Sequence, residues 1–122
     1  MKKILRFLKR RLNKMFGTLS DELFWRFRHF FNRRWALSYL SNDSLEHPHR
    51  RLLIEKISAY APFETVLEVG CASGPNLYLL ANKFPEAKLY GQDISPSAIY
   101  TGQKWFETQK IKNVFLTVAK SD

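Results

Sequence analysis

The second half of the chain alternates short β-rich runs with helical segments, and this alternation restricts the fold more than any other feature. The strand-like runs are residues 65–69, 88–93 and 113–119, and the helical segments are residues 75–83 and 96–106. Pro75 and Pro96 stand at the start of the two helices, where the fixed φ of proline suits the first turn. Short links between such elements imply parallel strands joined by right-handed crossovers. The sequence therefore predicts an α/β fold built on a three-stranded parallel sheet.

A loop of small residues follows the first predicted strand. Gly70, Ala72 and Gly74 allow the backbone to approach a ligand closely, and the helix that follows offers unpaired N–H groups. Asp93 ends the second strand, where a carboxylate can accept two hydrogen bonds from a ribose diol. The loop and the acid together predict an adenosine-type cofactor at the carboxyl ends of the strands.

The glycine spacing distinguishes two classes of cofactor site. The dinucleotide fingerprint requires three glycines, and counted from Gly70 the other two positions hold Ala72 and Pro75. The stretch Glu68–Leu77, EVGCASGPNL, instead resembles the first motif of class I S-adenosylmethionine-dependent methyltransferases, acid-x-Gly-x-Gly-x-Gly. The stretch Gly91–Ser95, GQDIS, resembles the second motif of that family. Residues 48–122 are thus similar to this family, and a nicotinamide-dependent oxidoreductase is the alternative.

The resemblance implies a Rossmann-like sheet and a role for six residues in binding S-adenosylmethionine. Gly70, Ala72 and Gly74 would line the methionine and ribose side, Glu68 would orient the loop and hold the amino-acid end, Asp93 would bind the ribose hydroxyls, and Ile94 would pack against adenine. Ala72 replaces the middle glycine of the motif, and its methyl group is compatible with the loop where φ is negative. Cys71 is expected to be a small buried residue, since no histidine is near it in sequence.

The family resemblance also implies that part of the domain is missing. The family fold has about seven strands, of which this sequence supplies three. We therefore expect a truncated sheet, an exposed apolar edge at residues 65–69, and a chain that holds only the cofactor-binding half of an enzyme. Such a chain should bind the cofactor weakly and should not transfer methyl groups alone. The methyl acceptor and the catalytic residues are not assigned.

The basic excess of the chain lies entirely in residues 1–51. This segment has 13 Lys and Arg against 4 Asp and Glu, whereas residues 52–122 have 7 of each. Such asymmetry indicates an anionic partner. Residues 3–19 have the pattern of a helix with one apolar and one basic face, which suits an anionic membrane surface. A helix that packs on the domain with its charges in water explains the pattern equally well.

Three further segments are predicted between this helix and the first strand. A helix from Asp21 to about Leu40 interleaves aromatic residues with arginines, residues 41–49 form a linker, and a helix from Pro48 to Tyr60 buries Leu52, Leu53, Ile57 and Tyr60. An aromatic stripe at helical spacing usually packs in a core. Stacking of these aromatic side chains on nucleic-acid bases is the alternative. We divide the chain into a helical N-terminal arm, residues 1–47, and a partial cofactor-binding domain, residues 48–122.

Several other classes of protein are excluded by the sequence. Charges interrupt every apolar run, which excludes a membrane-spanning helix of about 20 residues and argues against a secretory signal. His47 and His49 lack a second pair of suitably spaced ligands, so we predict no metal site. The single cysteine fits a reducing compartment. We expect a cytoplasmic protein, with residues 1–20 as a peripheral contact to anionic membrane.

Overall fold

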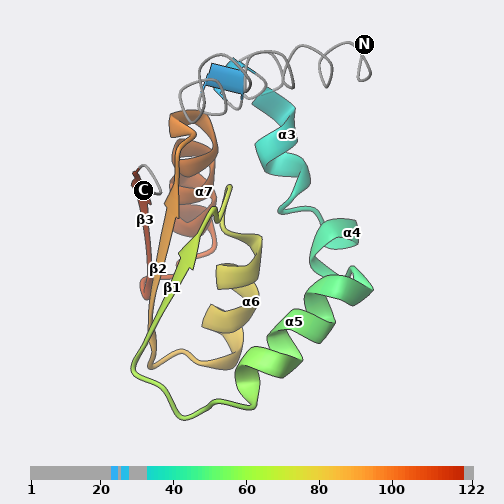
Figure 1. The fold of residues 1–122 in the computed structure, drawn as a ribbon, viewed down its shortest axis with the longest axis vertical. Coiled ribbons are helices and arrows are strands. Elements are labelled where there is room, and N and C mark those ends of the chain that lie inside the picture. Colours follow the sequence, from blue (N-terminus) through green and yellow to red (C-terminus); the bar gives the residue numbers. More distant parts are fainter. Residues whose placement is uncertain (1–22, 25, 28–32, 120–122) are drawn as a thin grey trace, which may run out of the picture.

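The computed structural model describes residues 23–24, 26–27 and 33–119 (Figure 1). In chain order the helices and strands are α3 (Arg33–Ser38), α4 (Asn42–Leu45), α5 (Pro48–Ser58), β1 (Thr65–Val69), α6 (Pro75–Lys83), β2 (Lys88–Asp93), α7 (Pro96–Thr108) and β3 (Val114–Val118). The amphipathic helix predicted over residues 3–19 lies outside the described residues.

The three strands form one parallel sheet in the order β1-β2-β3. Because both crossovers run in the same direction across the sheet, right-handed connections place α6 and α7 on the same face, and Figure 1 shows them there. The covered face contributes Leu89, Gly91 and Leu116 to the core, where they pack with Leu77 of α6 and Ile99 of α7. The predicted parallel α/β fold is confirmed.

The opposite face of the sheet is apolar and exposed in the described part of the chain. Leu67 is 57% exposed, and Tyr90 and Phe115 stack on each other with ring centroids 5.3 Å apart. Successive side chains of a strand point to opposite faces, so these residues alternate with the buried ones. As predicted, β1 is an edge strand within the described sheet.

The predicted linker over residues 41–49 is wrong, because it contains a helical turn and packs against the domain. The Ser41 side chain accepts a hydrogen bond from the Ser44 backbone N–H and caps α4, a role for which serine is favoured. Leu45 in α4 is only 8% exposed. His47 in turn caps α5 through Nδ1, which accepts from the His49 N–H at 3.3 Å.

The side of α5 that is buried also differs from the prediction. Ile54 is 9% exposed and Ile57 is half-buried, whereas Leu52 is 52% and Tyr60 is 84% exposed. Apolar residues occur all around this helix, so periodicity alone does not decide which side faces inward. The contacts of α5 with α4 and α6 decide it, and they also turn Arg50 toward the domain.

Helix α3 packs against the domain near the cofactor loop. The Ser73 hydroxyl donates to the Ala36 carbonyl oxygen at 2.7 Å, and both residues are almost fully buried. Trp35 and Tyr39 are half-buried, whereas Phe27 is 65% exposed, so only part of the aromatic stripe packs as predicted. The domain boundary between residues 47 and 48 stays a prediction.

Two searches of the described residues gave negative results. No helix in this part of the chain is long and apolar enough to cross a bilayer. The same residues contain no group of three or more His, Cys, Asp or Glu side chains arranged to hold a metal ion.

Candidate cofactor site

The loop between β1 and α6 owes its shape to three residues with positive φ. These angles are 77° at Gly70, 52° at Ala72 and 88° at Gly74. The backbone N–H groups of Gly70 and Cys71 both donate to the Gln92 carbonyl oxygen, at 2.7 and 3.0 Å. The loop is therefore fixed to the carboxyl end of β2, next to Asp93.

Ala72 does not have the negative φ that we expected from the sequence. Its φ of 52° is left-handed, a conformation that costs an L-residue about 1–2 kcal/mol. The Ala72 N–H donates to Asp93 Oδ2 at 2.8 Å, and this charge-assisted hydrogen bond offsets the strain. The expectation was wrong because the sequence did not show this contact across 21 residues.

Asp93 faces the loop from the end of β2. Its Oδ2 accepts from Ala72, and its Oδ1 accepts from the Ser95 N–H at 2.9 Å. Ser95 caps α7 by accepting from the Ala98 N–H. One carboxylate thus holds the cofactor loop and the start of α7 together. A carboxylate has about four lone-pair positions, so each oxygen can accept a further hydrogen bond.

Glu68 lies at the other side of the loop, in a network that reaches α5. Its Oε1 accepts from Asn76 Nδ2 at 2.7 Å, and Asn76 Oδ1 accepts from Arg50 Nη1 at 2.7 Å. Glu68 Oε2 is buried and has no hydrogen-bond partner in the described structure. A buried carboxylate oxygen without a donor is costly, so its retention suggests a role toward a ligand.

A cavity of about 450 Å³ opens at the carboxyl ends of the strands. This volume is within the range of about 300–1,000 Å³ for small-molecule sites. Of the six predicted cofactor-binding residues, five line the cavity, namely Glu68, Gly70, Ala72, Asp93 and Ile94. The sixth, Gly74, instead packs inside the domain, where an added Cβ would lie 2.9 Å from Phe106 Cε2.

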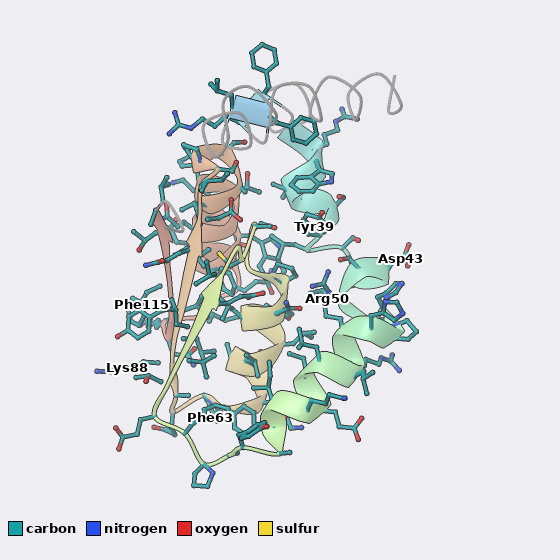
Figure 2. The ribbon with its side chains drawn as sticks, viewed as in Figure 1. Tyr39, Asp43, Arg50, Phe63, Lys88 and Phe115 are labelled. Carbon is teal, nitrogen blue, oxygen red and sulfur yellow. The ribbon has the colours of Figure 1, made fainter. Side chains whose placement is uncertain are left out.

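Four lining residues were not identified from the sequence: Trp35, Tyr39, Arg50 and Asn76. Three of them come from the N-terminal helices, and Figure 2 shows Tyr39 and Arg50 on the side of these helices that faces the domain. The only signal for Arg50 was its position four residues before Ile54, on the same side of α5. Asn76 follows directly after Pro75, in a first turn that opens onto the loop.

Residues 62–120 match the family described as "Methyltransferase domain". This part of the chain belongs to the class I S-adenosylmethionine-dependent methyltransferases. It is the cofactor-binding part of the domain, with the strand order, glycine loop and strand-end acid described above.

Known proteins similar to this methyltransferase domain are considerably longer. The protein RP028 of Rickettsia prowazekii (strain Madrid E) is 40% identical over 57 residues, which cover 45% of this chain and 23% of that protein. A SAM-dependent methyltransferase from Aquifex aeolicus has 25% identity and a TM-score of 0.50, with coverage of 64% and 45% of the two chains. Coclaurine N-methyltransferase, solved with N-methylheliamine and SAH, has 18% identity and a TM-score of 0.52 over 58% of this chain and 22% of its own. The chain thus spans less than half of each, and the matches do not favour the nicotinamide alternative.

The thiol of Cys71 in this methyltransferase domain is not a nucleophile. Cys71 is 2% exposed, as predicted. Burial, with the negative charges of Glu68 and Asp93, raises the pKa of the thiol to about 12. The reactive thiolate is therefore scarce at neutral pH.

Replacing Ala72 with glycine should stabilise the methyltransferase domain. Relief of the left-handed strain outweighs the larger backbone entropy of glycine in the unfolded chain, with an expected gain of about 0.5–1 kcal/mol. Chemical denaturation of Ala72→Gly measures this gain. Ala59→Gly is the matched control, because Ala59 is exposed with φ −64°, and it should lose stability. Equal losses in both variants would contradict the strain at Ala72.

Replacing Glu68 with glutamine should stabilise the domain at neutral pH. Burial raises the pKa of Glu68 above its ordinary 4.5, and the charge of Asp93 adds to this rise, although Asn76 and Arg50 oppose it. The folded state therefore binds the proton more tightly than the unfolded state, and stability falls as pH rises from 4.5 through the folded pKa. Glutamine keeps the Oε1 acceptor for Asn76 and removes the charge, so we expect a gain of about 1 kcal/mol at pH 7.

The measurement for Glu68→Gln is thermal unfolding of variant and wild type at a series of pH values. Their stability difference should shrink toward pH 4, where Glu68 of the wild type becomes protonated. Glu64→Gln, which neutralises an exposed carboxylate just before β1, controls for the change in net charge. A difference that is constant across the pH range would disprove the elevated pKa.

Proposed function

We propose that this chain is the cofactor-binding part of an enzyme that transfers the methyl group of S-adenosylmethionine to an acceptor. The observation that supports this most strongly is the cavity in which Glu68 and Asp93 stand on either side of the glycine loop. Two carboxylates across a loop of positive φ suit a ligand with a ribose diol at one end and an ammonium group at the other.

The residues of the cavity fit the parts of the cofactor. Asp93 accepts from the ribose hydroxyls while it holds the loop through Ala72. Glu68 Oε2, which lacks a donor in the described structure, faces the amino-acid end. Gly70 and Ala72 bring the backbone close to the ligand, and Ile94 lies beside adenine at the rim.

The chemistry needs alignment more than acid–base assistance from these residues. The bound cofactor supplies a methyl group that its positive sulfur already activates. The part played by this chain is to fix the position of that group, and orientation of reactants contributes a large share of the rate in such displacements. The described residues do not identify the acceptor or a general base.

Isothermal titration calorimetry of the purified chain tests the cofactor. We expect heat of binding with S-adenosylmethionine and with S-adenosylhomocysteine, and none with NAD. The negative control is the same chain with S-adenosylmethionine after thermal unfolding. Binding of NAD without binding of either sulfur nucleoside would overturn the proposal.

We further propose that the protein acts in the cytoplasm and that residues 1–20 contact anionic membrane surfaces. The support is the charge of residues 1–51, where 13 basic residues stand against 4 acidic ones. Flotation with phosphatidylserine vesicles tests the contact, with phosphatidylcholine vesicles as the control. Deletion of residues 1–20 should abolish flotation, and unchanged flotation after the deletion would end this proposal.

A further inference from the structure

Arg50 occupies a position on α5 where a charged side chain is unusual. It lies on the side of the helix that also presents Ile54 and Ile57 to the domain, and it is half-buried. The next residue, Arg51, is exposed on another side of the helix. Burial lowers the pKa of Arg50, although its guanidinium stays charged at neutral pH. A half-buried charge at such a position needs specific partners.

Hydrogen bonds to α4 and α6 hold the Arg50 guanidinium in place. Nε and Nη2 donate to the carbonyl and hydroxyl oxygens of Ser44, at 2.9 and 3.1 Å. Nη1 donates to Asn76 Oδ1 at 2.7 Å. A guanidinium has five N–H donors, so two remain without a partner among the described residues, one on each Nη nitrogen. Both belong to a group that lines the cavity.

The cavity therefore holds a fixed positive group beside a fixed negative one. Asn76 joins Arg50 to Glu68, donating to the carboxylate and accepting from the guanidinium. No direct ion pair links Arg50 and Glu68 in the described structure, which leaves Glu68 Oε2 without a donor. This arrangement is complementary to a zwitterion, a group with an ammonium and a carboxylate on neighbouring atoms. An α-amino-acid group is such a zwitterion.

We propose that Arg50 and Glu68 form a clamp for the α-amino-acid group of the cofactor, in which Arg50 donates to its carboxylate and Glu68 Oε2 accepts from its ammonium group. This inference rests on the proposed function, since the cofactor named there ends in that group. It makes α5 part of the cofactor site, together with Trp35 and Tyr39, which line the same cavity from α3 and the turn after it. Recognition of carboxylates is a chemistry for which the arginine fork is well suited.

The competing explanation is that Arg50 only ties α4 to α6. The two explanations differ in what they predict for ligands with and without the carboxylate. Three probes separate them, namely S-adenosylhomocysteine, its decarboxylated analogue, and 5′-methylthioadenosine, which lacks the whole amino-acid group. A structural tie affects the affinity for all three equally, whereas a carboxylate-binding residue affects only the first.

The experiment is calorimetric titration of the full chain and its Arg50→Ala variant with these three ligands. Wild type should bind S-adenosylhomocysteine about 10- to 100-fold more tightly than the decarboxylated analogue, as expected for charged hydrogen bonds. Arg50→Ala should lose this preference and bind the decarboxylated analogue and 5′-methylthioadenosine like wild type. Arg51→Ala, the adjacent exposed arginine, should retain the preference and controls for the loss of one positive charge.

Each outcome decides for or against the clamp. Equal losses for all three ligands, or an unchanged preference in Arg50→Ala, would overturn it. If Arg50→Ala does not fold, Arg50→Lys replaces it, and a selective loss of at least about threefold for S-adenosylhomocysteine is expected because lysine lacks the fork. The ratio of affinities is independent of the folded fraction. If wild type binds none of the three ligands, the proposed function itself fails, and if it binds them without the selective loss, only the clamp fails.

Discussion

Replacing Gly102 with alanine is expected to destabilise the domain by about 2 kcal/mol, although alanine is the better helix former. Gly102 is buried in α7. A Cβ at this position would meet the Ser73 carbonyl oxygen and would lie 2.6 Å from Leu116 Cδ1. The carbonyl belongs to the backbone of the cofactor loop, which cannot rotate away as a side chain can. Overpacking of this kind costs about 1–3 kcal/mol and outweighs the gain of about 1 kcal/mol in helix propensity.

Chemical denaturation of Gly102→Ala measures this loss, and titration with S-adenosylhomocysteine reports on the displaced loop. Both stability and affinity should fall, because Ser73 lies between Ala72 and Gly74 in the loop. Glu107→Ala, at an exposed position of the same helix, is the matched control and should change stability by less than about 0.5 kcal/mol. A Gly102→Ala variant as stable as wild type would mean that α7 lies farther from the loop than the structure places it.

The parts of the fold that could be predicted from the sequence are those that local signals determine. Pro75 and Pro96 set the starts of α6 and α7, and Ser95 caps α7 through its side chain as expected. The strands β1 and β2 match the predicted ranges, and β3 is one residue shorter at each end. Caps, prolines and alternating burial act within a few residues, so a single sequence displays them directly.

The parts that could not be predicted depend on contacts between distant residues. The left-handed φ of Ala72 accompanies its hydrogen bond to Asp93, and the inward side of α5 depends on the contact of Arg50 with Asn76. Neither pair has a spacing that a sequence motif records. For the same reason the predicted site contained the loop and the strand-end acid but not the residues of the N-terminal helices. Such contacts depend on how whole elements pack.

Replacing Asp93 with asparagine is expected to weaken the binding of S-adenosylhomocysteine by about 100-fold or more. The carboxylate accepts from two backbone N–H groups, those of Ala72 and Ser95. Asparagine offers one acceptor oxygen and one NH2 group, so one backbone donor would face another donor. The ribose hydroxyls lose a charged acceptor at the same time, and each charged hydrogen bond contributes about 1.5–3 kcal/mol. The loop should also loosen, with a loss of stability of about 1–3 kcal/mol.

Adenosine and 2′,3′-dideoxyadenosine separate the loss of ribose binding from the loss of loop geometry. Wild type should prefer adenosine, since only adenosine has the diol that Asp93 can bind. Asp93→Asn should bind the two nucleosides with nearly equal affinity, whatever its folded fraction. Asp43→Asn, which changes an exposed acid in α4, should behave like wild type in both titrations. A preference for adenosine that persists in Asp93→Asn would show that another group holds the ribose, and the cofactor orientation assigned to this cavity would then be wrong.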